Sequence, residues 1–180
     1  MKEISEISSM FPITLNRISL SSFEQKDISE EYISWLNDPE VVKYSNQRFK
    51  THNRETSRLY LDSFLNSCNI FLAITDNNSK SMIGTMTVYF SKNHKTADIG
   101  IMIGKREFWG KGIGEEAWLA VMELLLKKTD IRKITGGTVS CNKGMIRIFQ
   151  KVGMIQDGVR KDHEIIDNKV HDIIYFAKFK

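Results

Sequence analysis

Three glycines alternate with other residues in the segment 109–116, which reads WGKGIGEE. An extended apolar run, 99–103, precedes this segment, and a helical pattern, 117–128, follows it. The order is therefore strand, glycine-rich turn and helix. Glycine allows a ligand to lie directly on the backbone, and a helix N-terminus adds unsatisfied N–H donors and a positive dipole end. The segment predicts a binding site for a phosphate or pyrophosphate group.

Two common phosphate-binding motifs do not match this turn. The P-loop requires Lys-Ser or Lys-Thr after its glycines, and neither pair follows any of the glycines here. The dinucleotide-binding motif requires G-x-G-x-x-G, whereas the spacing here is G-x-G-x-G. The sequence therefore disfavours an ATP- or NAD-binding protein of these two classes.

The turn resembles the acyl-CoA loop of the GNAT acetyltransferases, which is written (Q/R)-x-x-G-x-(G/A). Gly112 and Gly114 fill the two small positions, and Trp109 stands where Gln or Arg is usual. That departure is similar to the RimJ/RimL-type branch of the family, in which W-G-K-G followed by E-A is a common form.

A second segment, 142–154, resembles the later motif of the same family, N-x-x-(S/A)-x-x-x-x-(E/Q)-K-x-G-F. Asn142, Lys151 and Gly153 match this motif, while Met154 replaces its phenylalanine. The spacing between the two motifs suits one intervening helix and one strand. We therefore expect an acetyl-CoA-dependent N-acetyltransferase of the RimJ/RimL-like branch. A non-catalytic acyl-CoA-binding sensor on the same fold is the alternative.

The resemblance implies acetyl-CoA as the co-substrate. Backbone groups of Ile101, Met102 and Ile103 would hold its pantetheine arm. Backbone amides of the turn would bind its pyrophosphate, and these belong to Trp109, Gly110, Lys111, Gly112, Ile113, Gly114 and Glu115. Asn142 and Lys151 could also reach the cofactor, although a helix N-cap fits Asn142 and a solvated face fits Lys151 as well.

Acetyl transfer to an amine requires a neutral amine, a donor for the developing oxyanion and a proton for the leaving thiolate. The resemblance places Asp98 where many relatives carry a glutamate, so Asp98 is the first candidate for the base. Glu116 is the second, although an acid in the first turn of a helix could serve the dipole instead. Many relatives protonate the thiolate with a tyrosine where this chain has Phe149. Ser140 and Tyr89 are weaker substitutes.

The segment 35–48 belongs to the region that usually builds the acceptor side in this superfamily. It is similar to RimJ/RimL-type enzymes and to enzymes that acetylate nucleotide-linked amino sugars. Tyr44, Gln47, Arg48 and Tyr89 are the candidate acceptor contacts, and helix packing is the alternative interpretation of the segment. We expect a small-molecule or peptide amine as the acceptor, with an amino-sugar nucleotide and a protein N-terminus as the main options.

The net charge is +4 over 180 residues, and Lys and Arg are scattered, so nucleic-acid binding is not expected. No apolar run approaches the roughly 20 residues that span a bilayer, and the N-terminus has no secretory signal pattern. The two cysteines form no disulfide framework, and the four histidines show no metal-binding spacing. We expect a cytoplasmic protein without a metal or a membrane partner. The oligomeric state stays open, with a homodimer as one option.

The length of 180 residues suits one domain, 1–180, and residues 1–10 are expected to be a loose or partly helical leader. By resemblance the chain forms a mixed α/β (α+β) fold, with a mostly antiparallel sheet of about seven strands flanked by helices. Acyl-CoA would lie where strands four and five, 96–103 and 133–139, splay apart. The other expected strands are 13–20, 70–75, 82–90, 155–166 and 170–179, and the expected helices are 28–36, 39–44, 51–66, 117–128 and 143–151.

Overall fold

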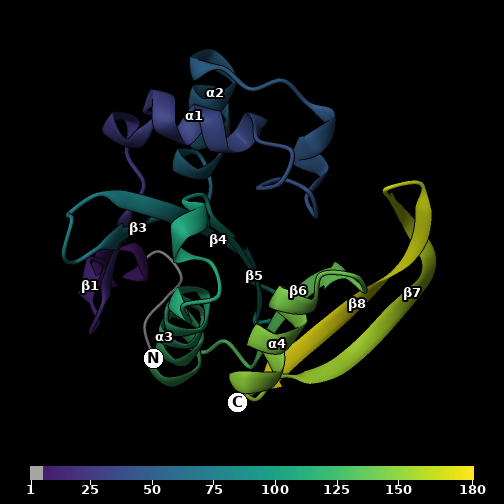
Figure 1. Cartoon of the computed structure of the whole chain (residues 1–180). Helices are drawn as coiled ribbons and strands as arrows, with labels where there is room; N and C mark the ends of the chain where they lie inside the picture. Colours follow the sequence, from purple (N-terminus) through teal and green to yellow (C-terminus); the bar gives the residue numbers. More distant parts are fainter. Residues whose placement is uncertain (1–5) are drawn as a thin grey trace.

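The central sheet has the strand order β1-β2-β3-β4-β5-β6-β8-β7 in the computed structural model, which describes residues 6–180 (Figure 1). Neighbouring strands are antiparallel except for the parallel pair β5 and β6. The expected mixed, mostly antiparallel fold is confirmed. The strands are β1 (Ile13–Thr14), β2 (Ile18–Ser22), β3 (Ile70–Asp76), β4 (Met82–Ser91), β5 (Thr96–Ile103), β6 (Lys133–Val139), β7 (Ile155–Ile166) and β8 (Lys169–Phe179).

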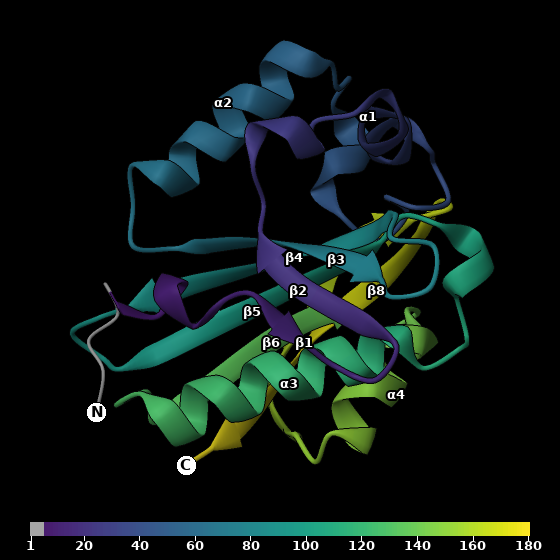
Figure 2. The same cartoon turned by 90° about the vertical axis from the view of Figure 1, so that its left-hand side faces the viewer.

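Helices cover both faces of the sheet, as Figure 2 shows. Helices α1 (Glu30–Asn37) and α2 (Arg54–Leu65) lie on one face, and α3 (Ile113–Lys128) and α4 (Lys143–Lys151) lie on the other. Each face has its own apolar cluster. The α1/α2 face is rich in aromatic side chains, and the α3/α4 face is the larger and mainly aliphatic one. Because helices cover both faces, the central strand β3 is buried along almost its whole length and reads as a nearly continuous apolar run.

Strands β5 and β6 separate after only three paired positions. The register joins Thr96 to Lys133, Ala97 to Ile134 and Asp98 to Thr135, and ends there. Beyond these pairs β5 stays in register with β4 as far as Ile103, while β6 follows β8. The expected splay between strands four and five is therefore confirmed, and it arises because each strand follows its other neighbour.

The first expected strand, 13–20, is a short hairpin of β1 and β2, so the sheet formed by residues 6–180 has eight strands. The chain turns at Asn16 and Arg17, and the amide of Leu15 donates to the carbonyl of Ile18 at 2.8 Å. Asn77, between β3 and β4, holds this turn through bonds to the carbonyls of Leu15 (2.9 Å) and Arg17 (2.9 Å). Two adjacent polar residues thus interrupt what the alternation predicted as one strand.

The expected helix at 39–44 does not form, and turns occupy this segment. The Asp38 side chain accepts from the amide of Glu40 at 2.9 Å, a local bond that competes with a helix. The expected helix 51–66 begins later, at Arg54. Asn53 caps α2 in a reciprocal arrangement with Thr56, because their side chains and amides bond each other at 2.8 and 2.9 Å.

Part of the expected leader, residues 1–5, lies outside the described residues. In its described part Ile7 is completely buried in the larger apolar cluster, whereas Glu6, Ser8 and Ser9 are exposed. Residues Ser8–Met10 form a short 3-10 helix. This segment therefore contributes to the core beside β1.

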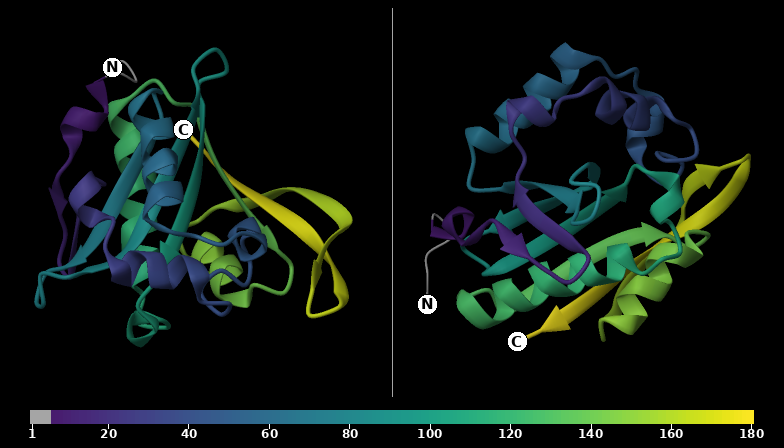
Figure 3. Two further views of the ribbon diagram at one scale, coloured as in Figure 1. Left: turned by 90° about the horizontal axis from the view of Figure 1, so that it is seen from above. Right: turned by 60° about the vertical axis from the view of Figure 1, so that its left-hand side comes forward.

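The hairpin of β7 and β8 extends beyond the rest of the sheet (Figures 1 and 3). Two ion pairs join its outer end to the segment between α1 and α2. Lys43 Nζ lies 2.8 Å from Asp167 Oδ2, and Arg48 Nη2 lies 2.8 Å from Glu164 Oε2. These contacts bring two segments that are far apart in sequence to opposite sides of one cavity.

Candidate active site

The glycine turn leaves the start of α3 without a side-chain cap. Gly110 and Gly112 have φ angles of 72° and 79°, which non-glycine residues rarely adopt. Gly112 is the N-cap, and no described side chain accepts from the amides of residues 113–115. A Cβ built on Gly110 would meet nothing within 4 Å. Free N–H donors beside open backbone fit an anionic group such as a pyrophosphate.

Gly114, the third glycine of the motif, allows close packing of two helices. A Cβ on Gly114 would lie 2.9 Å from Ile148 Cδ1, so its absence allows α3 and α4 to pack closely. Trp109 fixes the other end of the turn, because its indole Nε1 donates to the carbonyl of Ile103 at 2.7 Å. The turn is thus tied to the last residue of β5.

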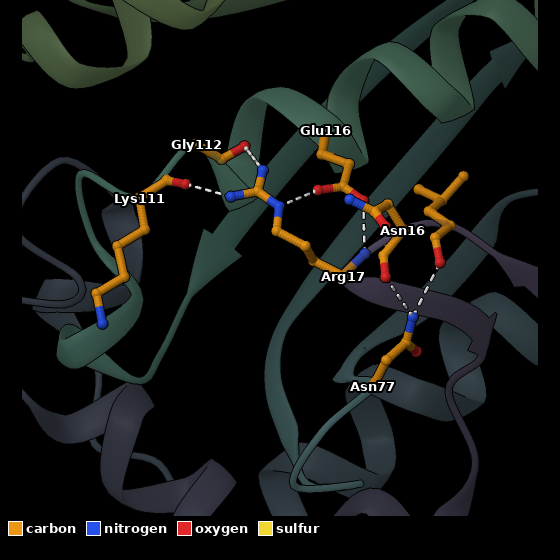
Figure 4. A network of polar contacts seen from close by, with 7 residues as sticks. Asn16, Arg17, Asn77, Lys111, Gly112 and Glu116 are labelled. Carbon is orange, nitrogen blue, oxygen red and sulfur yellow. Dashed lines mark hydrogen bonds and ion pairs between the residues drawn. The ribbon is translucent and has the colours of Figure 1, made fainter.

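Both acidic residues in the first turn of α3 are in ion pairs. Glu115 Oε2 lies 2.8 Å from Lys151 Nζ, and Glu116 Oε2 lies 2.7 Å from Arg17 Nε (Figure 4). Glu116 Oε1 accepts from the backbone amide of Arg17 at 3.1 Å, so both oxygens of Glu116 are engaged. The positive end of the helix is therefore not opposed by unpaired carboxylates.

Residues Ile101, Met102 and Ile103 lie where β5 has already separated from β6. Among the described residues, no strand pairs with the edge of β5 that faces β6 over this stretch. Met102 packs toward the α1/α2 cluster, and the two isoleucines pack toward the α3/α4 cluster. An unpaired strand edge supplies backbone donors and acceptors for an extended ligand.

Asp98 lies at the last paired position before the splay. Its Oδ2 accepts from Thr135 Oγ1 at 2.6 Å. Desolvation by surrounding protein raises the pKa of the Asp98 carboxyl, and the hydrogen bond from Thr135 lowers it to a smaller extent. Asp98 as a whole residue is nevertheless exposed, so part of its side chain contacts solvent. Across the sheet Asp98 pairs with Tyr89, whose hydroxyl lies 2.9 Å from that of Tyr60 in α2.

Two residues of the second motif have structural roles here. Asn142 caps α4, because Oδ1 accepts from the amide of Met145 at 3.2 Å, and its Nδ2 donates to Thr138 Oγ1 at 3.0 Å. Phe149 is completely buried between Trp118 and Phe176, with ring centroids 5.1 and 4.8 Å away. The position where relatives carry a tyrosine is therefore part of the core.

A cavity of about 770 Å³ lies between the α1–α2 segment and the outer end of the β7–β8 hairpin. Of the four expected acceptor contacts, Arg48 lines it, whereas Tyr44, Gln47 and Tyr89 do not. Tyr89 is instead beside Asp98. The lining residues include charges of both signs, namely Glu40, Lys43, Arg48, Lys50 and Asp167.

A family model described as "Acetyltransferase (GNAT) domain" matches residues 17–155. The chain belongs to the GNAT acetyltransferase family. This protein is therefore an enzyme, an acetyl-CoA-dependent N-acetyltransferase.

Relatives of this GNAT chain are distant in sequence but similar over nearly the full length. "Uncharacterized N-acetyltransferase p20" of Bacillus licheniformis is 23% identical over 172 residues, which cover 91% of this chain and 93% of the relative. The structure is similar to "RimL- Ribosomal L7/L12 alpha-N-protein acetyltransferase" in complex with coenzyme A, with a TM-score of 0.80, 16% identity and coverage of 93% and 96%. It is also similar to "Microcin C7 self immunity acetyltransferase MccE" in complex with acetyl-CoA and AMP, with a TM-score of 0.79, 20% identity and coverage of 92% and 94%. At these identities the two likenesses show that the fold is shared.

Two residues of the GNAT site were missed by sequence reasoning. Arg17 lay within the expected strand 13–20, although the polar pair Asn16-Arg17 is a signal for a turn. Thr135 gave no such signal, because its contact with Asp98 depends on the register of β5 and β6. Both residues contact expected site residues from elements that are distant in sequence.

No helix among residues 6–180 is long and apolar enough to cross a membrane. Within the same residues, no group of three or more His, Cys, Asp or Glu side chains is arranged to hold a metal ion.

Proposed function

We propose that this protein moves the acetyl group of acetyl-CoA to a primary amine by direct attack in a ternary complex. The amine nitrogen bonds to the acetyl carbon as the carbon–sulfur bond breaks, the amine loses a proton, and the leaving thiolate gains one. Acetyl-CoA supplies the acetyl group as an activated thioester. The observation that carries the proposal is the position of Asp98, which ends the paired part of β5 and β6 beside the unpaired strand edge.

The chain would hold acetyl-CoA with backbone groups at two places. The amides of residues 110–115 would bind the pyrophosphate, and this is supported by the open backbone at Gly110 and the uncapped start of α3. The edge of β5 from Ile101 to Ile103 would bind the pantetheine arm. Lys151 would act beside the turn by neutralising Glu115, and Asn142 by fixing the start of α4.

Asp98 would take the proton from the amine. A general base works best when its pKa approaches the operating pH, and desolvation raises the pKa of Asp98 in that direction. Thr135 would keep the carboxylate in one orientation. Glu116 is a weaker candidate for this role, because both of its oxygens are engaged by Arg17.

The leaving thiolate would take its proton from water, because Phe149 has no proton to give and is buried. Tyr89 would contact the acceptor amine beside the base, since it pairs with Asp98 across β4 and β5. Its hydroxyl is held by Tyr60 at 2.9 Å, which fixes its direction.

The acceptor would be a polar amine that reaches the site by way of the cavity beside the β7–β8 hairpin. A volume of about 770 Å³ suits a small molecule or the first residues of a peptide. Charges of both signs in the lining suit an acceptor that carries further polar groups besides its amine. An amino-sugar nucleotide and a protein N-terminus both meet this description.

Calorimetric titration with acetyl-CoA, CoA, ATP and NAD tests the cofactor, and release of CoA thiol with a panel of amines tests the reaction. We expect binding of acetyl-CoA and CoA, and thiol release with at least one class of amine. The panel should contain amino-sugar nucleotides, peptides with a free N-terminus and polyamines. Binding of CoA without thiol release from any amine would instead favour a non-catalytic acyl-CoA-binding sensor. Phe149, at the position where many relatives carry a tyrosine, favours that alternative as well.

A further inference from the structure

Arg17 connects the turn between β1 and β2 to the glycine turn that precedes α3 (Figure 4). We propose that Arg17 is a positioning residue, which holds the carbonyls of Lys111 and Gly112 so that the amides of the turn face the pyrophosphate of acetyl-CoA. The proposal rests on the proposed function, because it assigns Arg17 a task at the same cofactor site.

Each nitrogen of the Arg17 guanidinium donates to a different acceptor. Nη1 donates to the carbonyl of Lys111 at 2.6 Å, and Nη2 donates to that of Gly112 at 3.2 Å. Nε donates to Glu116 Oε2 at 2.7 Å. Three acceptors around one planar group fix its position and its plane.

These bonds determine where the amides of the turn point. In a trans peptide unit the C=O and N–H groups point in opposite directions. When the carbonyl of Lys111 points to Arg17, the amide of Gly112 points away from it. The same holds for the carbonyl of Gly112 and the amide of Ile113. The carbonyl of Gly112 also accepts from the amide of Glu116 at 3.1 Å, so the helix and Arg17 together orient the amide of Ile113, whereas Arg17 orients that of Gly112. Two consecutive N–H groups thus point away from Arg17, toward the side where an anion can be bound.

The bonds from Arg17 are needed because the glycines of the turn can adopt many backbone conformations. Gly110 and Gly112 have positive φ angles, and glycine populates negative φ angles about as readily. The peptide unit between Lys111 and Gly112 can therefore rotate unless a bond retains its carbonyl. If the binding-competent turn falls to about 1–10% of the population without Arg17, the apparent Kd for the cofactor rises about 10- to 100-fold.

The backbone of Arg17 is itself held by Asn77, in the turn between β3 and β4. The backbone amide of Asn77 donates to the carbonyl of Arg17 at 2.9 Å. The Asn77 side chain donates to the carbonyls of Leu15 at 2.9 Å and Asn16 at 3.4 Å (Figure 4). The glycine turn is therefore connected to the sheet through the β1–β2 turn and the β3–β4 turn.

The contacts favour support over direct binding of the anion. Glu116 neutralises the charge of Arg17, and the guanidinium is turned toward carbonyl oxygens, not toward the side that the amides face. A residue that binds phosphate as a point charge can be replaced by lysine. A residue that must reach two carbonyls and a carboxylate with one planar group cannot be replaced in this way.

The test compares R17K and R17A with the wild type in calorimetric Kd measurements with CoA, and in kcat/KM with S-acetylpantetheine, which lacks the pyrophosphate. We expect both variants to raise the Kd for CoA about 10- to 100-fold, and to leave kcat/KM for S-acetylpantetheine within about twofold. R132A is the matched control, since Arg132 follows the C-terminal end of α3, opposite the glycine turn, and its Nε donates to the carbonyl of His94 at 2.9 Å. We expect R132A to bind CoA as the wild type does.

Three results would overturn the proposal. A wild-type Kd in R17K together with a raised Kd in R17A would indicate that Arg17 acts as a point charge. An unchanged Kd for CoA in both variants would exclude any role of Arg17 in cofactor binding. An equal loss with CoA and with S-acetylpantetheine would indicate a general structural effect. R17K retains most of the side-chain volume, so it keeps the test valid if R17A does not fold. Failure of the wild type to bind CoA would instead refute the proposed function.

Discussion

Replacement of Asp98 by asparagine separates the chemistry of the site from its structure. Asparagine has nearly the same shape as aspartate, and its carbonyl oxygen can still accept from Thr135 Oγ1, which lies 2.6 Å from the native carboxylate. It cannot take a proton from an amine. We expect kcat with saturating acceptor to fall ~10²–10⁴-fold, the usual contribution of a general base. This is about 2.7–5.4 kcal/mol of activation free energy.

The same variant should keep its stability. Because desolvation raises the pKa of Asp98 in the folded state, the charged carboxylate destabilises the fold above that pKa, and this effect disappears as the pH falls below the unfolded-state pKa. The asparagine side chain of D98N carries no charge in either state. We therefore expect D98N to have a Tm at neutral pH no lower than that of the wild type. Its calorimetric Kd for acetyl-CoA should also be unchanged.

The pH profile completes the test, with CoA thiol release as the assay. The acidic limb of kcat/KM in the wild type should lie above the ordinary pKa of an aspartate, and D98N should lose it. T135V removes the hydrogen bond that lowers the pKa of Asp98, so it should move this limb to higher pH without abolishing turnover. Turnover by D98N within a few-fold of the wild type, with the limb retained, would refute the assignment of Asp98 as the base.

Three further substitutions test other parts of the site. G110A should lower Tm by ~2–8 °C in differential scanning calorimetry, because a side chain at φ 72° costs ~1–2 kcal/mol. An unchanged Tm would contradict the positive φ angle at position 110. F149Y should lower the free energy of unfolding in urea by ~1–3 kcal/mol without raising kcat, because its hydroxyl would be added to a completely buried ring; a higher kcat would show that the position reaches the thiolate. E164Q removes one partner of Arg48 at the cavity and should raise the acceptor KM about fivefold, ~1 kcal/mol, at unchanged Kd for acetyl-CoA; a changed Kd would contradict separate sites.

Sequence reasoning located the parts of the site that are local in the chain. The order of strand, glycine turn and helix is visible from 99 to 128, because glycine spacing and apolar periodicity are local properties. The splay followed from family resemblance. Its physical cause, the competing registers of β5 with β4 and β6 with β8, cannot be derived from either strand alone.

The errors occurred where a side-chain bond decided between two local conformations. Asp38 stabilises a turn where a helix was expected at 39–44, and Asn53 caps α2 inside the expected helix 51–66 because Thr56 reciprocates. The task of Arg17 was invisible for another reason. It depends on a contact with Glu116, 99 positions later in the chain, which no local pattern predicts.

The short ladder between β5 and β6 divides the sheet mechanically into two ribbons, one of five strands and one of three. Three residue pairs are all that the sheet itself provides to keep the ribbons aligned. A cofactor whose arm bonds along the free edge of β5 would stiffen the seam between them. Amide hydrogen exchange should then slow on binding not only at the glycine turn but also in β6, whose own backbone would gain protection as part of a more cooperative unit.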